Sequence, residues 1–226
     1  SIDLDKPRHL EVWQFRLCLG YKWGEMAVSQ GGDPTSFDGT LNAWITGFGS
    51  PITGLQKLNG QTLGVFCEDS VYSVTAGGTD GIGNPFYDQQ VLVPKVGALE
   101  YTVQDAGNSP MYVDPRGVTD LDTTSNYGDF QMGRMSNAVH RWLLPRLRRT
   151  LSTPKENHVV ATTVARAKNQ FRVYFADGHR MSVTLGGERP QITRQFLYTG
   201  GRKNQYIRVL NTEADIDSLY RDRVFF

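Results

Sequence analysis

The sequence has few features of a membrane, secreted or strongly basic protein. No apolar run in its 226 residues approaches the roughly 18 residues that a membrane-spanning helix needs, and no secretory signal is present. The formal net charge is +1, which excludes a strong overall attraction to nucleic acid or to an acidic membrane but allows a local patch. The chain starts at Ser1 and stops abruptly at Phe226, and we expect it to be a segment of a longer polypeptide.

Cysteine is scarce: the chain has two, Cys18 and Cys67. Neither belongs to a CxxC motif, and each stands inside an apolar strand pattern, LCLG or VFCED. We interpret both as small buried hydrophobic residues, the alternatives being a disulfide or a reactive thiol. This usage fits a reducing compartment.

Catalytic and metal-binding motifs are missing. The chain has no GxSxG, no P-loop and no HRD-type set, and the glycine-rich stretch at residues 77–84 lacks the Lys-Ser/Thr pair of a phosphate-binding loop. Asp215 and Asp217 stand in a polar stretch and are most simply a solvated surface. The four histidines are scattered and form no metal-binding spacing; they are His9, His140, His158 and His179. We therefore predict no enzymatic activity, no cofactor and no metal site.

What is present is alternation. Hydrophobic residues make up 39% of the chain and charged residues 21%, which suits a folded protein with a core. In residues 168–185, KNQFRVYFADGHRMSVTL, apolar residues alternate with polar ones on both sides of Asp177-Gly178. Period-two alternation around a tight turn predicts a half-buried antiparallel hairpin with a type I′ or related turn, in which Phe171, Val173 and Phe175 share the buried face.

Earlier segments follow the same design. Near the start, Phe15, Leu17 and Leu19 alternate, and Met26 and Val28 alternate on the return, which predicts another hairpin. Strands are also expected at residues 52–58, 62–67, 70–74, 98–103, 110–113, 118–121 and 159–167, and loops at the glycine-rich residues 31–51 and 76–90.

The hairpin tips recur at nearly regular intervals. From Tyr21 to Glu68 and from Glu68 to Pro115 the spacing is 47 residues, and from Pro115 to Ala176 it is 61, longer by 14. Repeats of this size, each of a few short strands, are typical of β-propeller blades. We therefore predict an all-β, β-propeller-like array of four-stranded antiparallel blades over residues 1–226, with an irregular β-sandwich as the alternative.

Residues 136–150, SNAVHRWLLPRLRRT, account for the extra length and are predicted to form a helical insert. Ser136 can cap a helix, and Pro145 would end or kink it. Its apolar side would lie on the propeller; it consists of Val139, Trp142, Leu143 and Leu147. The arginines read either as a solvated helix face or as a docking surface for an acidic partner subunit or for DNA phosphates. The candidate subunit-interface residues are Arg141, Trp142, Arg146, Arg148 and Arg149.

Three stretches carry a resemblance to a known family: RLCLGYKWGEMAVSQGGDPTSFDG, FGSPITGLQKLNGQTLGVFCEDSVYSVTAGG and RAKNQFRVYFADG. Together they resemble the tail tubular or nozzle proteins of short-tailed double-stranded DNA bacteriophages over roughly residues 10–185. The matching residues are Ser29, Asp33, Pro34 and Phe37; Ile52, Thr53, Gly54, Leu55, Val65, Phe66 and Ser70; and Lys168, Asn169, Gln170, Arg172, Phe175, Asp177 and Gly178.

The resemblance implies a structural role in the virion tail. Proteins of that family form a ring, a hexamer, at the distal end of the tail and enclose the channel through which the double-stranded DNA leaves. The ring docks to an adaptor protein and offers sites for tail fibres, and it is assembled in the host cytoplasm. The signature residues look structural rather than chemical. The alternative function is a propeller that binds or hydrolyses carbohydrate at a host surface, for which Trp13, Trp23, Trp44 and Trp142 are candidates.

Overall fold

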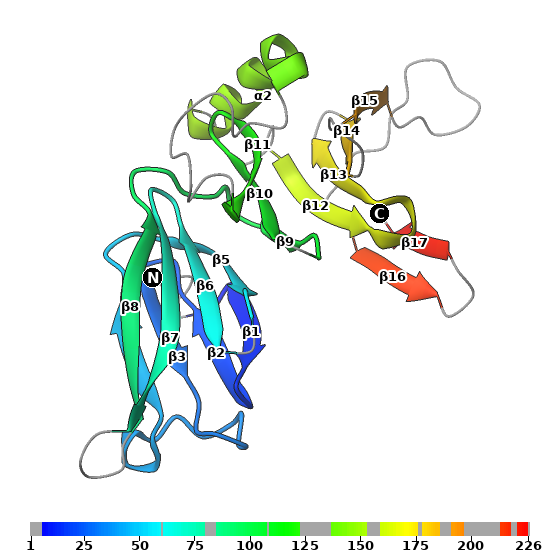
Figure 1. Cartoon of the computed structure of the whole chain (residues 1–226). Helices are drawn as coiled ribbons and strands as arrows, with labels where there is room; N and C mark the ends of the chain where they lie inside the picture. Colours follow the sequence, from blue (N-terminus) through cyan, green and yellow to red (C-terminus); the bar gives the residue numbers. More distant parts are fainter. Residues whose placement is uncertain are drawn as a thin grey trace. The chain divides into compact units, whose positions relative to one another are not determined.

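The computed structural model contains two compact units, residues 1–103 and residues 104–226, each with its own sheets (Figure 1). The residues that the structure describes are 6–59, 61–79, 85–107, 109–122, 137–152, 159–175, 178–185, 191–196, 213–217 and 221–225. No helix among them is long and apolar enough to cross a membrane.

The first unit holds two four-stranded antiparallel sheets, each made of consecutive strands. A short 3-10 helix, η1 (Gly39–Leu41), lies between β3 and β4. The strands of the first sheet are β1 (His9–Trp13), β2 (Arg16–Gly20), β3 (Glu25–Val28) and β4 (Trp44–Gly47). Those of the second sheet are β5 (Ile52–Lys57), β6 (Thr62–Cys67), β7 (Val71–Thr79) and β8 (Pro85–Val93).

The two sheets of this unit share one hydrophobic core. It combines large side chains of the first sheet with branched side chains of the second, and each fully buried one contributes roughly 1.5–3 kcal/mol. The main members are Trp13, Cys18, Met26 and Val28 from the first sheet and Ile52, Leu55, Leu63, Val65, Cys67 and Val74 from the second. Both cysteines thus lie in this core as free, buried residues, which confirms their interpretation as small hydrophobic side chains.

The second unit contains a three-stranded sheet, a helix, a four-stranded sheet and a final hairpin. Short 3-10 helices, η3 (Asn137–Val139) and η5 (Arg166–Lys168), precede α2 and follow β12. The main elements are β9 (Gln104–Asp105), β10 (Pro110–Asp114), β11 (Gly117–Asp120), α2 (His140–Ser152), β12 (Val159–Ala165), β13 (Gln170–Phe175), β14 (His179–Thr184), β15 (Gln191–Phe196), β16 (Glu213–Asp217) and β17 (Arg221–Phe225).

This topology confirms the predicted fold class, a nearly all-β, β-propeller-like array with one helical insertion. Each sheet takes its strands from one continuous stretch, whereas the Greek-key connections of a sandwich would alternate between sheets. The predicted tips Tyr21, Glu68 and Pro115 all fall in the connection between the second and third strands of a sheet, and so does position 176. The longer interval of 61 residues, from Pro115 to position 176, contains α2, which lies between β11 and β12.

The hairpin at residues 168–185 is not half-buried as predicted. Phe171, Val173 and Phe175 are buried, but so are Arg172 and Tyr174 between them. The reason is that β13 is a central strand, paired with β12 and β14 and covered on both faces. The predicted tight turn at Asp177-Gly178 falls mostly on Ala176 and Asp177, which lie outside the described residues. Gly178 has φ +81°, and its N–H donates to the carbonyl of Phe175.

The first predicted hairpin is confirmed as β2 and β3, but its apolar residues do not share one face, because Met26 and Val28 are buried in the core. Gln14 and Phe15 form a two-residue turn at φ +50° and +58° between β1 and β2, and Phe15 is exposed. Trp13 and Cys18 point to the core, while Leu17 and Leu19 are half-buried on the other face. Two non-glycine residues at positive φ give no sequence signal of the Asn-Gly kind, so the sequence does not indicate β1 before them.

Two predicted loops are partly strand, and one predicted strand is a loop. β4 lies within residues 31–51, and β7 and β8 extend into residues 76–90. The glycine-rich residues 76–79 were expected to form a loop, but Gly78, at φ +109°, forms a bulge inside β7 and does not end the strand. Residues 98–103 form turns, in which Thr102 donates through its backbone N–H to the carbonyl of Leu99.

Candidate functional site

The helix α2 is the predicted candidate site, and its position follows from two leucines. Leu143 and Leu147 lie four residues apart on one helix face, and both are completely buried. Pro145 stands inside the helix, which continues to Ser152, so the proline does not end it. The expectation that an apolar side fixes the insert to the sheets is confirmed for these two leucines.

Trp142 is the centre of a cluster of aromatic and cationic side chains. Its ring meets Phe175 edge-on at 5.6 Å and His179 at 5.9 Å between ring centroids. The guanidinium carbon of Arg146 lies 4.1 Å from the indole centroid, and that of Arg194 lies 5.6 Å away. Cation–π contacts of this kind hold guanidinium groups in place while leaving N–H groups at their edges for other acceptors.

The predicted interface arginines do not share one environment. Arg146 folds back on its own helix: Nη1 donates to the carbonyl of Trp142 at 3.2 Å, and Nη2 lies 3.5 Å from Nδ1 of His179. Arg141 is exposed. The side chains of Arg148 and Arg149 lie outside the described residues. The structure therefore brings Trp142 and Arg146 together and adds Arg194 and His179, which sequence spacing could not associate with the helix.

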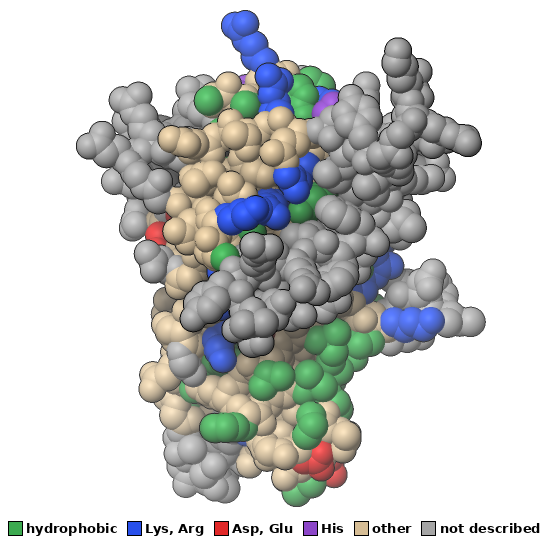
Figure 2. All heavy atoms as spheres, turned by 90° about the vertical axis from the view of Figure 1, so that its right-hand side faces the viewer, with side chains coloured by type: hydrophobic (Ala, Val, Ile, Leu, Met, Phe, Trp, Pro, Cys, Tyr) green, Lys and Arg blue, Asp and Glu red, His purple; other side chains and the backbone are tan. Residues whose placement is uncertain are grey.

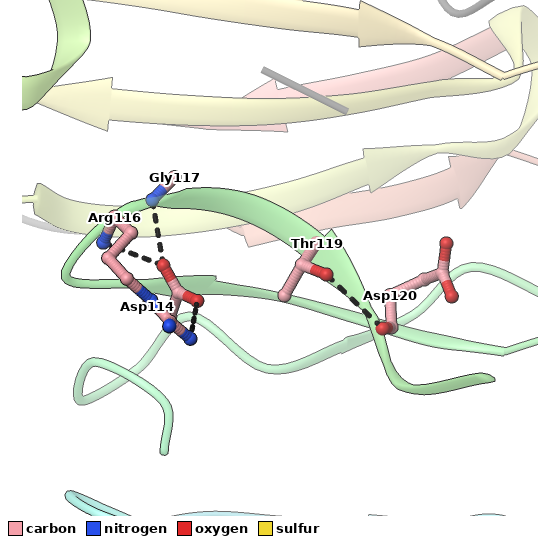
Figure 3. A network of polar contacts seen from close by, with 5 residues as sticks. All are labelled: Asp114, Arg116, Gly117, Thr119 and Asp120. Carbon is pink, nitrogen blue, oxygen red and sulfur yellow. Dashed lines mark hydrogen bonds and ion pairs between the residues drawn. The ribbon is translucent and has the colours of Figure 1, made fainter. Parts of the chain in front are cut away.

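A buried carboxylate, Asp114, is the other conspicuous polar group of this unit. Its Oδ1 accepts from the backbone N–H of Arg116 and of Gly117, both at 2.7 Å, and its Oδ2 accepts from Nη2 of Arg116 at 3.1 Å (Figure 3). Nearby, the hydroxyl of Thr119 donates to the carbonyl of Asp120. Three donors on one carboxylate close the turn between β10 and β11, so Asp114 stabilises a hairpin rather than serving as a base.

The two thiols and the tryptophans have mainly structural environments. Burial raises the pKa of both Cys18 and Cys67 to about 12, which keeps them protonated near neutral pH. Trp13 is completely buried, and the ring of Trp44 stacks on Tyr87 at 4.3 Å.

Among the described residues, no group of three or more His, Cys, Asp or Glu could hold a metal ion.

Most described residues that carry the phage-tail resemblance build the sheets. Ser29 Oγ accepts from the N–H of Leu17, and Thr53 Oγ1 donates to the carbonyl of Phe66. Gly54 sits at a bulge where a Cβ atom would lie 2.6 Å from Cγ2 of Val103. In the last motif, Asn169 takes a left-handed conformation at φ +48°, and Asp177 lies outside the described residues.

The sequence did not reveal an uncovered apolar face on the first sheet. The register aligns Leu10 with Leu19, Leu19 with Ala27 and Ala27 with Ile45, so one apolar row crosses all four strands. Leu10, Val12 and Ile45 are 62%, 60% and 70% exposed, and Phe15 in the adjoining turn is 88% exposed. Figure 2 shows hydrophobic side chains gathered on one side of the first unit, in the lower part of the view. We call this surface the open face; it consists of Leu10, Leu19, Ala27 and Ile45 together with Val12 and Phe15.

No protein-family model matches the chain, and no curated protein matches it. The solved structures with a similar fold named here are 9–12% identical to this chain. They include the extracellular domain of a hybrid two-component system from B. thetaiotaomicron, at TM-score 0.52 and 9% identity over 93% of this chain. They also include the β-propeller domain of Myceliophteria thermophila Cps50 (Swd1), at TM-score 0.44 and 12% identity over 79%, and the Chaetomium thermophilum Nup170 N-terminal domain in its complex with Nup53, at 0.45 and 9% over 82%.

The chain spans only part of these proteins: 52% of the Cps50 domain, 25% of the two-component system domain and 27% of the Nup170 chain. At such low identity the likeness is one of fold alone.

Proposed function

We propose that this chain is a structural component of a short-tailed phage tail, part of a nozzle or tube that assembles as a ring around the exit path of the genome. One observation carries the proposal: the described residues of the family-like motifs serve mainly to build sheets, as a rigid conduit requires. Ser29 and Thr53 satisfy backbone groups, Gly54 permits a close approach, and Gln170 holds the guanidinium of Arg172.

The physical demands of such a role agree with this construction. A conduit needs stiffness and lateral contacts, and stacked sheets with central strands buried on both faces supply stiffness. The proposed partners are copies of the chain itself in a ring, an adaptor protein, tail fibres and, transiently, double-stranded DNA. The near-neutral net charge suits a channel that must release its cargo.

The test is localisation. Antibodies raised against the purified chain are applied to phage particles from the source culture and viewed by negative-stain electron microscopy with gold label. We expect label at the tail of short-tailed particles. Label confined to capsids or to cell envelope fragments, on particles that contain the chain by mass spectrometry, would overturn the proposal.

A second candidate, sugar binding at a host surface, has one observation in its favour. Trp23 stacks on Tyr21 at 4.6 Å at the tip between β2 and β3, and its indole N–H donates to Oε2 of Glu25 at 2.6 Å. Sugar rings stack on exposed aromatic faces, but here the ring of Tyr21 already covers one face of Trp23. A glycan array decides: saturable binding that Trp23→Ala abolishes would favour this candidate, and uniform absence of binding would exclude it.

A further inference from the structure

The two units carry opposite net charges. Residues 1–103 contain 6 Lys and Arg against 11 Asp and Glu, a net charge of 6 − 11 = −5. Residues 104–226 contain 18 against 12, a net charge of 18 − 12 = +6. The overall charge of +1 hides this asymmetry. A charge division of this size between two compact units favours contact between unlike units and disfavours contact between like ones.

The open face belongs to the acidic unit and has acidic residues at its border. Glu25 is on the same face of β3 as Ala27, two residues away, and is exposed. Asp33 lies beside the turn that presents Phe15, because the N–H of Gly32 donates to the carbonyl of Phe15 at 2.9 Å. Asp33 accepts from the backbone and hydroxyl of Thr35, which lower the pKa of its carboxyl and keep it ionised. The open face is therefore an apolar surface with the carboxylates of Glu25 and Asp33 at its border, and the guanidinium of Arg16 beside it is held by the carbonyls of Ser29 and Asn42.

The basic unit offers a surface of matching character around α2. The indole of Trp142 is half-buried, and the exposed residues Arg141 and Arg194 stand beside it, one next to it in the chain and one above its ring. This is an amphipathic surface with a positive border. Arg and Trp are also enriched among the interface residues that contribute most of the binding free energy.

We propose that the open face of one copy of this chain docks on the α2 surface of a second copy, unit 1 of one against unit 2 of the next. Two open faces cannot pair equally well, because that arrangement would bring the acidic borders with Glu25 and Asp33 together. The head-to-tail arrangement brings the apolar open face against the indole of Trp142 and the carboxylates of Glu25 and Asp33 near the guanidinium groups of the α2 surface. A heterologous contact of this kind generates a ring when its rotation closes, and a filament otherwise.

The turn of Gln14 and Phe15 supports an interfacial role for this face. Left-handed φ at two consecutive non-glycine residues is costly, and such strain persists where the surroundings or a function require it. The strained turn holds a phenylalanine almost entirely in solvent. Burial of that side chain against another copy would recover part of the cost.

The experiment uses two variants of the full chain, each with one surface blocked. Leu10→Asn with Ile45→Asn blocks the open face, and Arg141→Glu with Arg194→Glu blocks the α2 surface; all four positions are exposed. By sedimentation velocity at low salt we expect the unmodified chain to self-associate and each variant alone to be monomeric, with association at least tenfold weaker. Mixed together, the variants should form 1:1 dimers and nothing larger, because one intact contact remains.

Matched controls separate these effects from general damage. Phe86→Asn with Val91→Asn replaces exposed apolar residues of the second sheet, and Lys168→Glu reverses an exposed charge of the basic unit. Both controls should assemble like the unmodified chain, and assembly should weaken as salt rises. A monomeric unmodified chain, self-association of the α2-blocked variant at full strength, or the absence of a mixed dimer would each overturn the proposal.

This inference deepens the proposed function and rests on its requirement that the chain assembles with itself. The two can fail separately. Gold label at phage tails together with no mixed dimer would refute the docking mode alone, and a mixed dimer without tail label would refute the tail role alone.

Discussion

The guanidinium of Arg172 donates two hydrogen bonds to Oε1 of Gln170, from Nε at 3.2 Å and from Nη2 at 3.0 Å. The two residues are two positions apart on β13 and therefore on the same face of the sheet. Arg172 is buried, so the amide oxygen replaces water around a charged group. Gln170→Met keeps the volume and removes that acceptor, and we expect it to lower the free energy of unfolding by about 1–3 kcal/mol in urea titrations.

The control for this pair is Gln195→Met on β15, an exposed position that should change stability by less than about 0.5 kcal/mol. Equal stability of both variants would mean that Gln170 is not the acceptor on which the buried charge depends.

Phe175 tests the assignment of the core of the fourth sheet. Its side chain is buried and meets the edge of the Trp142 ring. Phe175→Ala should cost about 3–5 kcal/mol, since a cavity remains where the ring was. Phe86→Ala, at a half-exposed position of the second sheet, is the matched control. A loss under about 1 kcal/mol for Phe175→Ala would contradict the burial assigned to this ring.

His9 should make the first unit sensitive to acid. Burial lowers its pKa from 6.5 to about 4, against the opposing effect of the Glu100 carboxylate. Between these two pH values the unfolded chain binds a proton that the folded chain does not, so stability is full above about pH 6.5 and falls as the pH drops towards 4. The shift corresponds to at most about 3 kcal/mol. Chemical denaturation at pH 7.5 and pH 4.5 measures it, and His9→Gln should reduce the difference between the two.

The thiols give a chemical test of the first core. With pKa values of about 12, Cys18 and Cys67 should react with iodoacetamide at pH 8 at least tenfold more slowly in the folded chain than in urea. Mass spectrometry of each cysteine peptide follows the labelling. Fast labelling of either residue in the folded chain would show that the contact between the first two sheets opens readily.

Gly54 tests the close packing after the bulge in β5. A methyl group there would lie 2.6 Å from Cγ2 of Val103, closer than real contacts come, and 3.0 Å from its Cβ, which is tight. Gly54→Ala should therefore lower the melting temperature, at a cost of about 1–3 kcal/mol. Adding Val103→Ala makes room, and the double variant should recover part of the loss. If the second substitution only adds to the first, the two sites do not meet.

The sequence predicts the regular strands well, but it predicts bulged strands and turns without glycine poorly. The strands at residues 52–57, 62–67 and 110–114 follow from alternation and from turn residues such as Asn59 and Asp114, because local chemistry decides them. The end of β7 lies in a glycine-rich stretch because Gly78 forms a bulge in its pairing with β8. β4 and the start of β8 lie in stretches rich in turn-forming residues, and their strand state depends on pairing with β3 and β7. The turn at Gln14 and Phe15 has no local signal at all.

The candidate site could be predicted only in part for a similar reason. Helical spacing identifies Leu143 and Leu147 as the buried side of α2, since that pattern lies within one element. The positions of His179 and Arg194 against Trp142 depend on strands more than thirty residues further along, and spacing cannot supply them. The open face could not be predicted because it depends on the register of four strands together.

Because every sheet is built from consecutive strands, most strand pairings join residues close together in the chain. A short separation between paired strands lowers the loop-closure entropy that is lost before each pair forms. The first sheet can form as soon as residues 9–47 have left the ribosome, long before the basic unit is synthesised. Until the basic unit is made, nascent chains on one messenger carry the acidic unit alone, and charges of one sign disfavour contacts between them.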